Sequence, residues 1–164
     1  MPGIMIIAAS DGDNLVLAQK FKSVSEELGV HSEILDLAGM DLPLFSNSRR
    51  KEDGTPQAVL DLIPVLADTT GWIVCAPEYN GSIPPSLNNL IAWLSIQGDD
   101  FRALFNSRKI GLSTHSGGGG AHVIMSMRQQ FAFLGSDVLG RAILTNRNKE
   151  ANYDAIVQMI TALG

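Results

Sequence analysis

Short apolar runs alternate with amphipathic segments along the whole chain, which predicts a repeating strand–helix order. Five apolar runs have the length and composition of strands: 3–9, 31–37, 71–76, 109–114 and 137–143. The run 31–37 mixes polar and apolar residues, which predicts a strand nearer the edge of the sheet. Strands that alternate with helices require right-handed crossovers and therefore a mainly parallel sheet. We expect a three-layer α/β/α fold built on a doubly wound, five-stranded parallel sheet.

The segments between these runs carry apolar residues at helical spacing. The residues expected to face inward are Leu17, Phe21, Val24 and Leu28; Val59, Leu62, Ile63 and Leu66; Leu87, Leu90, Ile91 and Leu94; Val123, Met127, Phe131 and Leu134; and Ile156, Ile160 and Leu163. Gly29 is placed to end the first helix, whereas Pro64 predicts a kink or an end in the second. The polar segment 38–54 is predicted to be a surface connection. The length of 164 residues, without internal repeats, predicts a single domain over residues 1–164.

Composition narrows the functional classes. With 45% hydrophobic and 18% charged residues the chain is globular, and its formal net charge of −5 argues against a nucleic-acid partner. The basic triplet 49–51 is interpreted as a solvated loop, with a binding patch as the less favoured alternative. The single cysteine, Cys75, fits a reducing compartment and is interpreted as a small hydrophobe of the core. No apolar run reaches the ~20 residues of a membrane span, and no signal-peptide pattern is convincing, so we expect a cytoplasmic protein without a membrane partner.

The loop after the run 71–76 has the most distinctive sequence of the chain. It reads Pro77-Glu78-Tyr79-Asn80-Gly81-Ser82-Ile83-Pro84 and continues as Leu87-x-Asn89-x-Ile91-x-Trp93-Leu94-Ser95. Open α/β sheets bind their ligands at the carboxyl ends of strands, where this loop is expected to lie. The prolines stiffen the loop, and Asn80 and Gly81 tolerate the positive φ of a sharp turn. Ser82 and Ser86 are predicted to cap the helix that follows.

This ordered string closely resembles the flavin-ring loop of the NAD(P)H-dependent flavin mononucleotide (FMN) reductase family, which includes quinone, chromate and azo-dye reductases. The resemblance implies a flavodoxin-like fold with strand order 2-1-3-4-5. It also implies that the loop borders the flavin ring, mostly through backbone contacts. On this basis the expected cofactor-binding residues of the loop are Pro77, Glu78, Tyr79, Asn80, Gly81 and Ser82. Asn88 and Ala92 depart from the family pattern of a lysine and an acidic residue, which we expect to affect surface or subunit contacts.

A second loop, Ser113-Thr114-His115-Ser116-Gly117-Gly118-Gly119-Gly120, resembles the Ser-Thr-x-x-Gly-Gly-x-Gly loop of the same family. Consecutive glycines let the backbone approach a planar ligand closely. The resemblance places this loop beside the pyrimidine end of the flavin ring. The cofactor-binding residues expected from it are Thr114, His115, Ser116, Gly117 and Gly118.

Two histidines, His115 and His122, flank these glycines. One of them could hydrogen-bond a flavin carbonyl or a substrate oxygen, although an exposed loop histidine is the favoured interpretation. No carboxylate or cysteine accompanies them at ligand spacing, so we expect no metal site. Ser116 lies beside His115, but there is no Gly-x-Ser-x-Gly elbow, which argues against a hydrolase.

The loop after the first strand departs from the family pattern, which is Ser-x-Arg-x-x-Ser-x-Asn and holds the FMN phosphate. Here Ser10 and Asn14 match, and only Asp11, Gly12 and Asp13 stand between them. The arginine and the second hydroxyl are absent, and two carboxylates are added. These changes predict phosphate binding weaker by roughly two orders of magnitude. Ser10 and Asn14 remain expected cofactor-binding residues, with Asn14 as the cap of the following helix.

Three interpretations of this shortened loop stay open. The favoured one is a solvated turn whose carboxylates complement the helix dipole. Alternatively, the pocket is adapted to a flavin without phosphate, or to no flavin. A cation that bridges the carboxylates and a phosphate is the least favoured, because the sequence has no complete Ca²⁺ loop.

The leading functional hypothesis is an FMN-dependent NAD(P)H oxidoreductase. A nicotinamide would pass a hydride to the flavin, and a second acceptor, such as flavin or quinone, would then use the same site in a ping-pong order. No catalytic side chain is assigned, because the flavin supplies the chemistry. The expected cofactors are FMN and NADPH or NADH, and the expected partner is a small-molecule electron acceptor. The alternatives are a flavodoxin-like, non-catalytic binding module with weakened or lost FMN binding, and an electron-transfer flavodoxin.

The family resemblance also implies a homodimer or homotetramer, with the site near a subunit interface. Trp72, Trp93 and the segment 38–54 are candidates for this interface.

Overall fold

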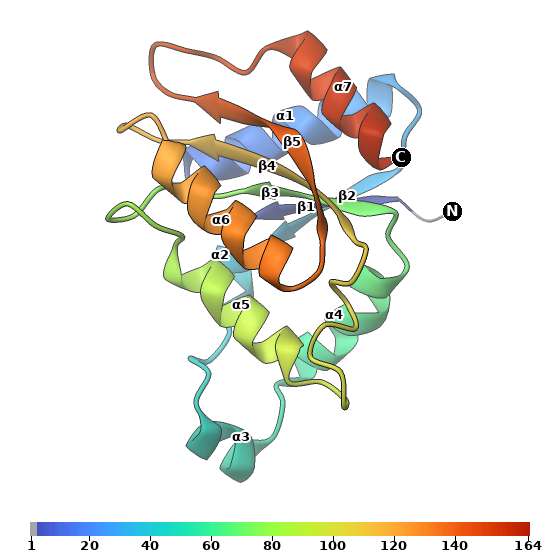
Figure 1. Cartoon of the computed structure of the whole chain (residues 1–164), viewed down its shortest axis with the longest axis vertical. Coiled ribbons are helices and arrows are strands. Elements are labelled where there is room, and N and C mark those ends of the chain that lie inside the picture. Colours follow the sequence, from blue (N-terminus) through green and yellow to red (C-terminus); the bar gives the residue numbers. More distant parts are fainter. Residues whose placement is uncertain (1–2) are drawn as a thin grey trace.

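The computed structural model describes residues 3–164 and has the expected three-layer architecture (Figure 1). Five parallel strands form one sheet in the order β2-β1-β3-β4-β5. The strands are β1 (Ile4–Ala8), β2 (Ser32–Asp36), β3 (Gly71–Cys75), β4 (Lys109–His115) and β5 (Asp137–Thr145). The flavodoxin-like order is therefore confirmed. The mixed-polarity strand, β2, lies at the edge of the sheet as its sequence predicted.

Helices cover both faces of the sheet and bury a separate core on each (Figure 1). One face carries α1 (Asp13–Glu27) and α7 (Tyr153–Leu163). The other face carries α4 (Gln57–Ala67), α5 (Pro85–Ser95) and α6 (Ala121–Phe133). The three central strands need apolar residues on both faces, which explains why β1 and β3 are buried along their whole length.

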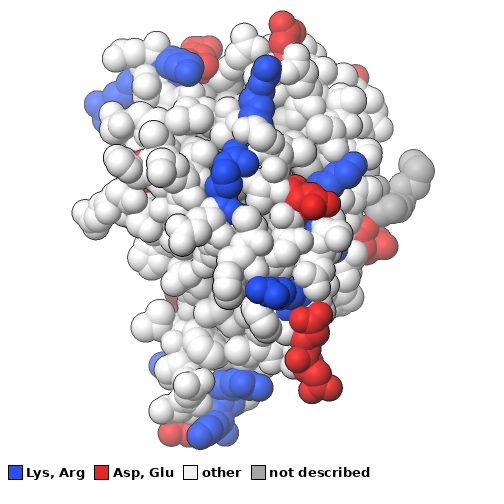
Figure 2. Space-filling model, viewed as in Figure 1, with Lys and Arg blue, Asp and Glu red and all other residues white. Residues whose placement is uncertain are grey.

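The connection 38–54 is more ordered than its sequence indicated. It contains two short helices, α2 (Leu37–Met40) and α3 (Asn47–Asp53), each started by a side-chain cap. The Asp36 carboxylate accepts hydrogen bonds from the N–H groups of Ala38 and Gly39, and the Ser46 hydroxyl accepts one from Arg49. The basic triplet 49–51 lies on exposed α3, at the lower end of the molecule where Figure 2 shows a basic group. Local capping therefore accounts for α3, which buries no residue, whereas α2 also buries Leu37 in the core.

Two residues expected to end helices behave differently. Gly29 follows α1 with φ of 70°, the left-handed conformation that ends helices. Pro64 does not end α4, which continues to Ala67. Pro64 has no N–H to donate to the carbonyl of Leu60. Leu60 is exposed, so water can solvate this carbonyl.

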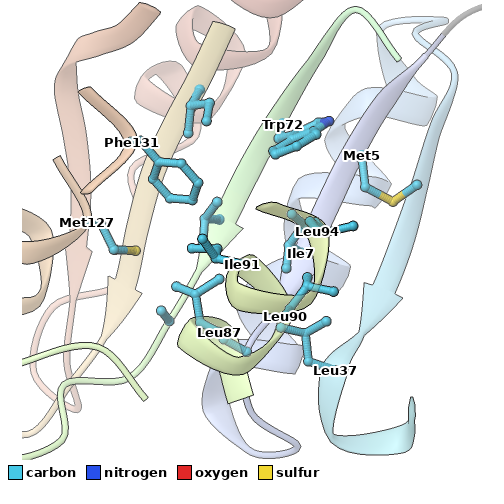
Figure 3. Close-up of a cluster of buried hydrophobic side chains, with 14 of the residues drawn as sticks. Met5, Ile7, Leu37, Trp72, Leu87, Leu90, Ile91, Leu94, Met127 and Phe131 are labelled. Atoms are coloured by element: carbon cyan, nitrogen blue, oxygen red, sulfur yellow. The ribbon is translucent and has the colours of Figure 1, made fainter. Parts of the chain in front are cut away.

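Both tryptophans lie in the core between the sheet and helices α4, α5 and α6, so the expectation that they contribute to a subunit interface is wrong. Trp72 and Trp93 are 1% and 0% exposed. The indole N–H of Trp93 donates to the carbonyl of Pro43 at 2.8 Å, and Phe45 packs edge-on against its ring. Figure 3 shows Trp72 beside the side chains that α5 directs toward the sheet. Trp93 thereby anchors the long 38–54 connection.

Replacing Trp93 with alanine should lower the free energy of unfolding by about 3–5 kcal/mol, because it leaves a large cavity and removes one of the two hydrogen bonds to the Pro43 carbonyl. Chemical denaturation of the full chain measures this change. Val16→Ala is the control, since Val16 is 62% exposed on α1 and should change stability by no more than about 0.5 kcal/mol. Equal, small losses in both variants would contradict the anchoring role of Trp93.

Candidate functional site

Three loops meet at the carboxyl edge of the sheet. They follow β1, β3 and β4, which are neighbours in the sheet, so their carboxyl ends emerge side by side. The strand order reverses between β1 and β3, and ligands of open α/β sheets bind at such a switch point. We refer to residues 9–12 as the first loop, 76–84 as the ring loop and 116–120 as the glycine loop. The expected site residues after these strands are thus brought to one edge.

The ring loop projects as a tight turn. Tyr79 and Ser82 exchange both backbone hydrogen bonds at 3.0 Å, which closes a two-residue turn of Asn80 and Gly81. These two residues have φ of 52° and 73°, so the predicted positive φ is confirmed. The Tyr79 side chain is half exposed at the start of this turn.

The prediction that Ser82 and Ser86 cap α5 is wrong, because both serines make other contacts. Pro84 is the N-cap residue, Pro85 is the first helical residue, and no side chain caps the helix. Ser82 is held in the turn, and the Ser86 hydroxyl donates to the carbonyl of Ala9 at 2.7 Å. Proline at the first position fixes the helix start without a cap, which leaves Ser86 free to join the first loop to α5.

Glu78 joins the ring loop to the glycine loop. One oxygen of its carboxylate accepts hydrogen bonds from the N–H groups of His122 and Val123, both at 3.0 Å. Helix α6 has no cap of its own, because its N-cap residue is Gly120 in the left-handed conformation. A carboxylate at a helix N-terminus is favoured by the helix dipole. This role could not be read from the sequence, since Glu78 and His122 are 44 residues apart.

The four glycines of the second loop fall into two pairs. Gly119 and Gly120 have φ of 91° and 74°, and a side chain on Gly120 would collide with Thr114. Neither a positive φ nor a steric clash requires glycine at Gly117 or Gly118. A Cβ atom on Gly117 would meet nothing within 4 Å, and one on Gly118 would meet only the Glu78 carboxylate, at 3.5 Å. These two positions therefore leave an open strip of exposed backbone, which any larger side chain would cover.

The residues before this strip are buried. Thr114 is fully buried, and within residues 3–164 its hydroxyl has no hydrogen-bond partner. Ser116 is 8% exposed and its N–H donates to the carbonyl of Thr145, which prolongs the sheet by one bond beyond β4.

His115 is partly buried and is held between β5 and α1, so the favoured interpretation of an exposed loop histidine is wrong. Its Nδ1 lies 3.0 Å from the hydroxyl of Thr145, which itself donates to the Thr114 carbonyl, so Nδ1 carries the proton. Its Nε2 lies 3.6 Å from the carboxylate of Asp13. The ring lines a cleft of about 270 Å³ together with Lys20 and Glu150. His122, in contrast, is exposed on α6.

Asn14 is not the cap of α1, as its sequence position suggested. Gly12 occupies the cap position without a side-chain bond, and Asn14 lies inside the helix, 2% exposed. Its amide group donates to the carbonyl of His115 at 3.0 Å and accepts from the His115 N–H at 2.9 Å. The Asn14 side chain thus pairs with the end of β4 as a neighbouring strand would. Ser10, half-buried, starts the first loop after β1.

Cys75 ends β3 directly before the ring loop and is fully buried, as its sequence position indicated. Burial raises the pKa of its thiol to about 12, and the nearby Ser113 hydroxyl opposes this effect in part. The thiol is therefore neutral and acts as a core side chain.

Comparison with known proteins identifies the family. Residues 2–150 match the family described as NADPH-dependent FMN reductase. The chain belongs to this family. A quinone reductase of Escherichia coli is 33% identical over 103 residues, which cover 62% of this chain and 53% of that protein. A quinone reductase of Shigella flexneri gives the same values. The chain thus spans about half the length of the curated relatives it matches.

Solved structures share the fold at low identity. FerB, a flavoenzyme NAD(P)H:(acceptor) oxidoreductase from Paracoccus denitrificans, is similar with a TM-score of 0.78 at 18% identity, covering 100% of both chains. An azoreductase from Bacillus anthracis has a TM-score of 0.68 at 16% identity, covering 99% of this chain and 95% of that one. A flavodoxin from Pseudomonas aeruginosa has a TM-score of 0.67 at 13% identity, covering 99% of both chains. No helix within residues 3–164 is long and apolar enough to cross a membrane.

Family membership implies FMN as the cofactor and NADPH or NADH as the electron donor, and the residues fit this cofactor unevenly. At the ring end, the open backbone of Gly117 and Gly118 and the unpaired hydroxyl of Thr114 suit a planar group with polar edges. At the phosphate end, Asp11 and Asp13 are exposed carboxylates at the start of α1. The ring site therefore fits a flavin, whereas the phosphate end offers little to an anion.

Replacing Glu78 with alanine should lower the free energy of unfolding by about 1–2 kcal/mol, because α6 loses its only side-chain cap. Glu78→Gln is the matched control, since an amide oxygen can still accept from His122 and Val123. Thermal unfolding of both variants measures the difference. If the alanine variant is as stable as the glutamine variant, the contact does not hold the two loops together.

Cys75 should resist alkylation in the folded protein. With a pKa of about 12, roughly one thiol in ten thousand is ionised near pH 8, and burial blocks access to it. Mass spectrometry after iodoacetamide treatment should show unmodified native protein and full modification in denaturant. Rapid modification of native protein would show that the end of β3 opens.

Proposed function

We propose that the chain is an FMN-dependent NAD(P)H oxidoreductase that reduces a small acceptor such as a quinone or a flavin. One observation carries this proposal beyond family membership. Glu78 bonds the ring loop to the start of α6, and its carboxylate lies next to the open backbone of Gly118. Uncovered backbone beside a loop that is tied down in this way suits a flat cofactor.

The chain's residues would position and polarise the flavin, and the bound flavin would supply the hydride chemistry. The first N–H groups of α5 have no side-chain cap, so they and the helix dipole favour negative charge at this edge. The α6 N-terminus differs, because Glu78 already occupies its N–H groups at His122 and Val123. We therefore assign the polarising role to α5 and to backbone amides of the ring loop. No side chain needs to transfer a proton in this scheme.

The remaining site residues support the loops in this proposal and do not take part in the chemistry. Pro77 is buried and fixes the start of the ring loop, and Ser82 closes its turn. His115 would support the glycine loop from the α1 side, through Thr145 and Asp13. Electron donor and acceptor would enter the same open face in turn, which is a ping-pong order. The quinone reductases of the curated relatives make a quinone the first acceptor to test.

Three further expectations belong to this proposal. Residues 1–164 form a single flavodoxin-like domain, of which residues 1 and 2 lie outside the described part. The protein is cytoplasmic, and it assembles as a homodimer or homotetramer. With both tryptophans inside the core, exposed Phe101 and Phe133 are better candidates than Trp72 and Trp93 for a subunit contact.

A non-catalytic binding module remains the second candidate, because one observation favours it. The phosphate end combines Asp11 and Asp13 with an Asn14 amide that already bonds His115. A chain that had lost flavin binding would show such a change. The intact ring end opposes this alternative, since Gly117 and Gly118 have no packing role that would otherwise retain them.

The full chain, supplied with FMN and a quinone, should oxidise NADH or NADPH, as followed by the absorbance of the reduced nicotinamide. Gly117→Leu should lower this rate by at least about tenfold, because the side chain would cover the open backbone. Its stability should change by no more than about 0.5 kcal/mol, since a Cβ there meets no atom. Gly140→Leu is the control, because Gly140 is equally open but lies within β5.

No nicotinamide oxidation with either donor, under conditions in which the flavin is bound, would sink the reductase and favour the binding module. An equal loss of rate in both leucine variants would mean that Gly117 does not border the reacting groups.

A further inference from the structure

We propose that the flavin site of this chain does not select for the terminal phosphate, so that it binds riboflavin about as tightly as FMN. The inference rests on the proposed function, because it concerns the same flavin site. It specifies the ligand class as flavins irrespective of their phosphate.

The position that a phosphate would take is set by the fold. The first loop leaves β1 at the switch point between β1 and β3 and leads directly into α1, and helix N-termini at such points bind phosphates. Helix α1 begins at Asp13 after Gly12, and no side chain caps it. Its first N–H groups are therefore the main attraction that the chain offers to an anion.

Two carboxylates act against that attraction. Asp11 is exposed in the loop, and the Asp13 side chain is 72% exposed in the first turn of α1. A unit charge at about 4 Å from another like charge weakens binding by roughly fivefold even with the screening of water. Asp13 has one potential counter-charge, Nε2 of His115 at 3.6 Å, which is a full charge only when the ring is protonated.

No lysine or arginine side chain offsets these carboxylates. Lys20 is the first basic residue of α1 and lines the same cleft as Asp13, but its ammonium group donates to the carbonyl of Ala151 at 3.3 Å and forms no ion pair with Asp13. Among the ion pairs and side-chain hydrogen bonds within residues 3–164, none joins a lysine or an arginine to Asp11 or Asp13. The first loop therefore has no paired cation that could strengthen phosphate binding by a charge-assisted hydrogen bond.

The remaining polar side chains of this region, Asn14 and Ser10, add little attraction for a phosphate. The Asn14 amide bonds the backbone of His115 through one N–H and its oxygen, at 3.0 and 2.9 Å, and turning toward a phosphate would break both bonds. Ser10 is then the one hydroxyl of the loop. The attraction of a few N–H groups and one hydroxyl is set against two carboxylates, so the phosphate contributes little net affinity.

The ring end does not depend on these groups. The turn at Asn80 and Gly81 and the open backbone of Gly117 and Gly118 would contact the ring that FMN and riboflavin share. The contribution of the ring to binding is therefore the same for FMN and riboflavin and drops out of the ratio of their dissociation constants. The ratio of their dissociation constants reports on the first loop alone.

The test is to titrate FMN and riboflavin separately into the flavin-free full chain, following the quenching of flavin fluorescence. EDTA is present so that no divalent cation can bridge the carboxylates and the phosphate. The two dissociation constants should agree within about tenfold, a difference of about 1.4 kcal/mol. FMN binding tighter than riboflavin by more than this factor would overturn the inference.

Binding of neither flavin has a different meaning. It would show that the ring site itself fails, which removes the proposed function and the inference together. Binding of both flavins without nicotinamide oxidation would retain the inference and reject the reductase.

A double variant, Asp11→Asn with Asp13→Asn, tests whether the two carboxylates are what weakens phosphate binding. It should tighten FMN binding by about fivefold or more and leave riboflavin binding unchanged, because only the phosphate feels the removed charges. Asp154→Asn is the matched control, since Asp154 is also an exposed acid in the first turn of a helix, α7. Unchanged FMN affinity in the double variant, or equal tightening of both flavins, would contradict the inference.

Discussion

Backbone groups at the carboxyl edge of a buried sheet need hydrogen-bond partners, and this requirement shapes the whole site. The ladders between strands continue only one residue past the strand ends, at Ala9, Ala76 and Ser116, so the backbone groups beyond need other partners. Asn14 meets the need at the end of β4, where its amide bonds both backbone groups of His115. Glu78 meets it at the start of α6, where its carboxylate bonds two N–H groups. Both side chains come from a neighbouring loop or helix, so each contact also fixes the distance between two chain segments.

These two contacts have opposite consequences for ligand binding. Glu78 holds the ring loop against the glycine loop and leaves the backbone at Gly117 and Gly118 uncovered. Asn14 uses its polar group within the protein, so the N–H groups of α1 and the Ser10 hydroxyl are what the first loop keeps for an anion. The same need for hydrogen-bond partners therefore builds one end of the proposed flavin site and weakens the other. An uneven site of this kind suits a ligand whose affinity comes from a flat ring.

The core explains why the loops can be held so rigidly. Separate apolar clusters on the two faces of the sheet bury β1 and β3 completely, so close packing holds the strands that carry the first loop and the ring loop. Trp93 extends this order to the 38–54 connection by its bond to Pro43 and its contact with Phe45. The tryptophans therefore belong to the scaffold, and the uncovered part of the site is mainly backbone, with Tyr79 exposed beside it.

The strand–helix alternation, the edge position of β2 and the positive φ at Asn80 and Gly81 could all be predicted from the sequence, because they depend on local spacing and on residue type. The family was also readable from the ring loop. The errors concern side chains whose partners are distant in sequence. Asn14, Ser86 and Glu78 all look like local helix-start or loop residues, yet each bonds a segment at least 44 residues away. Local pattern determined the elements, and only the packing of the sheet decided which polar groups each side chain would satisfy.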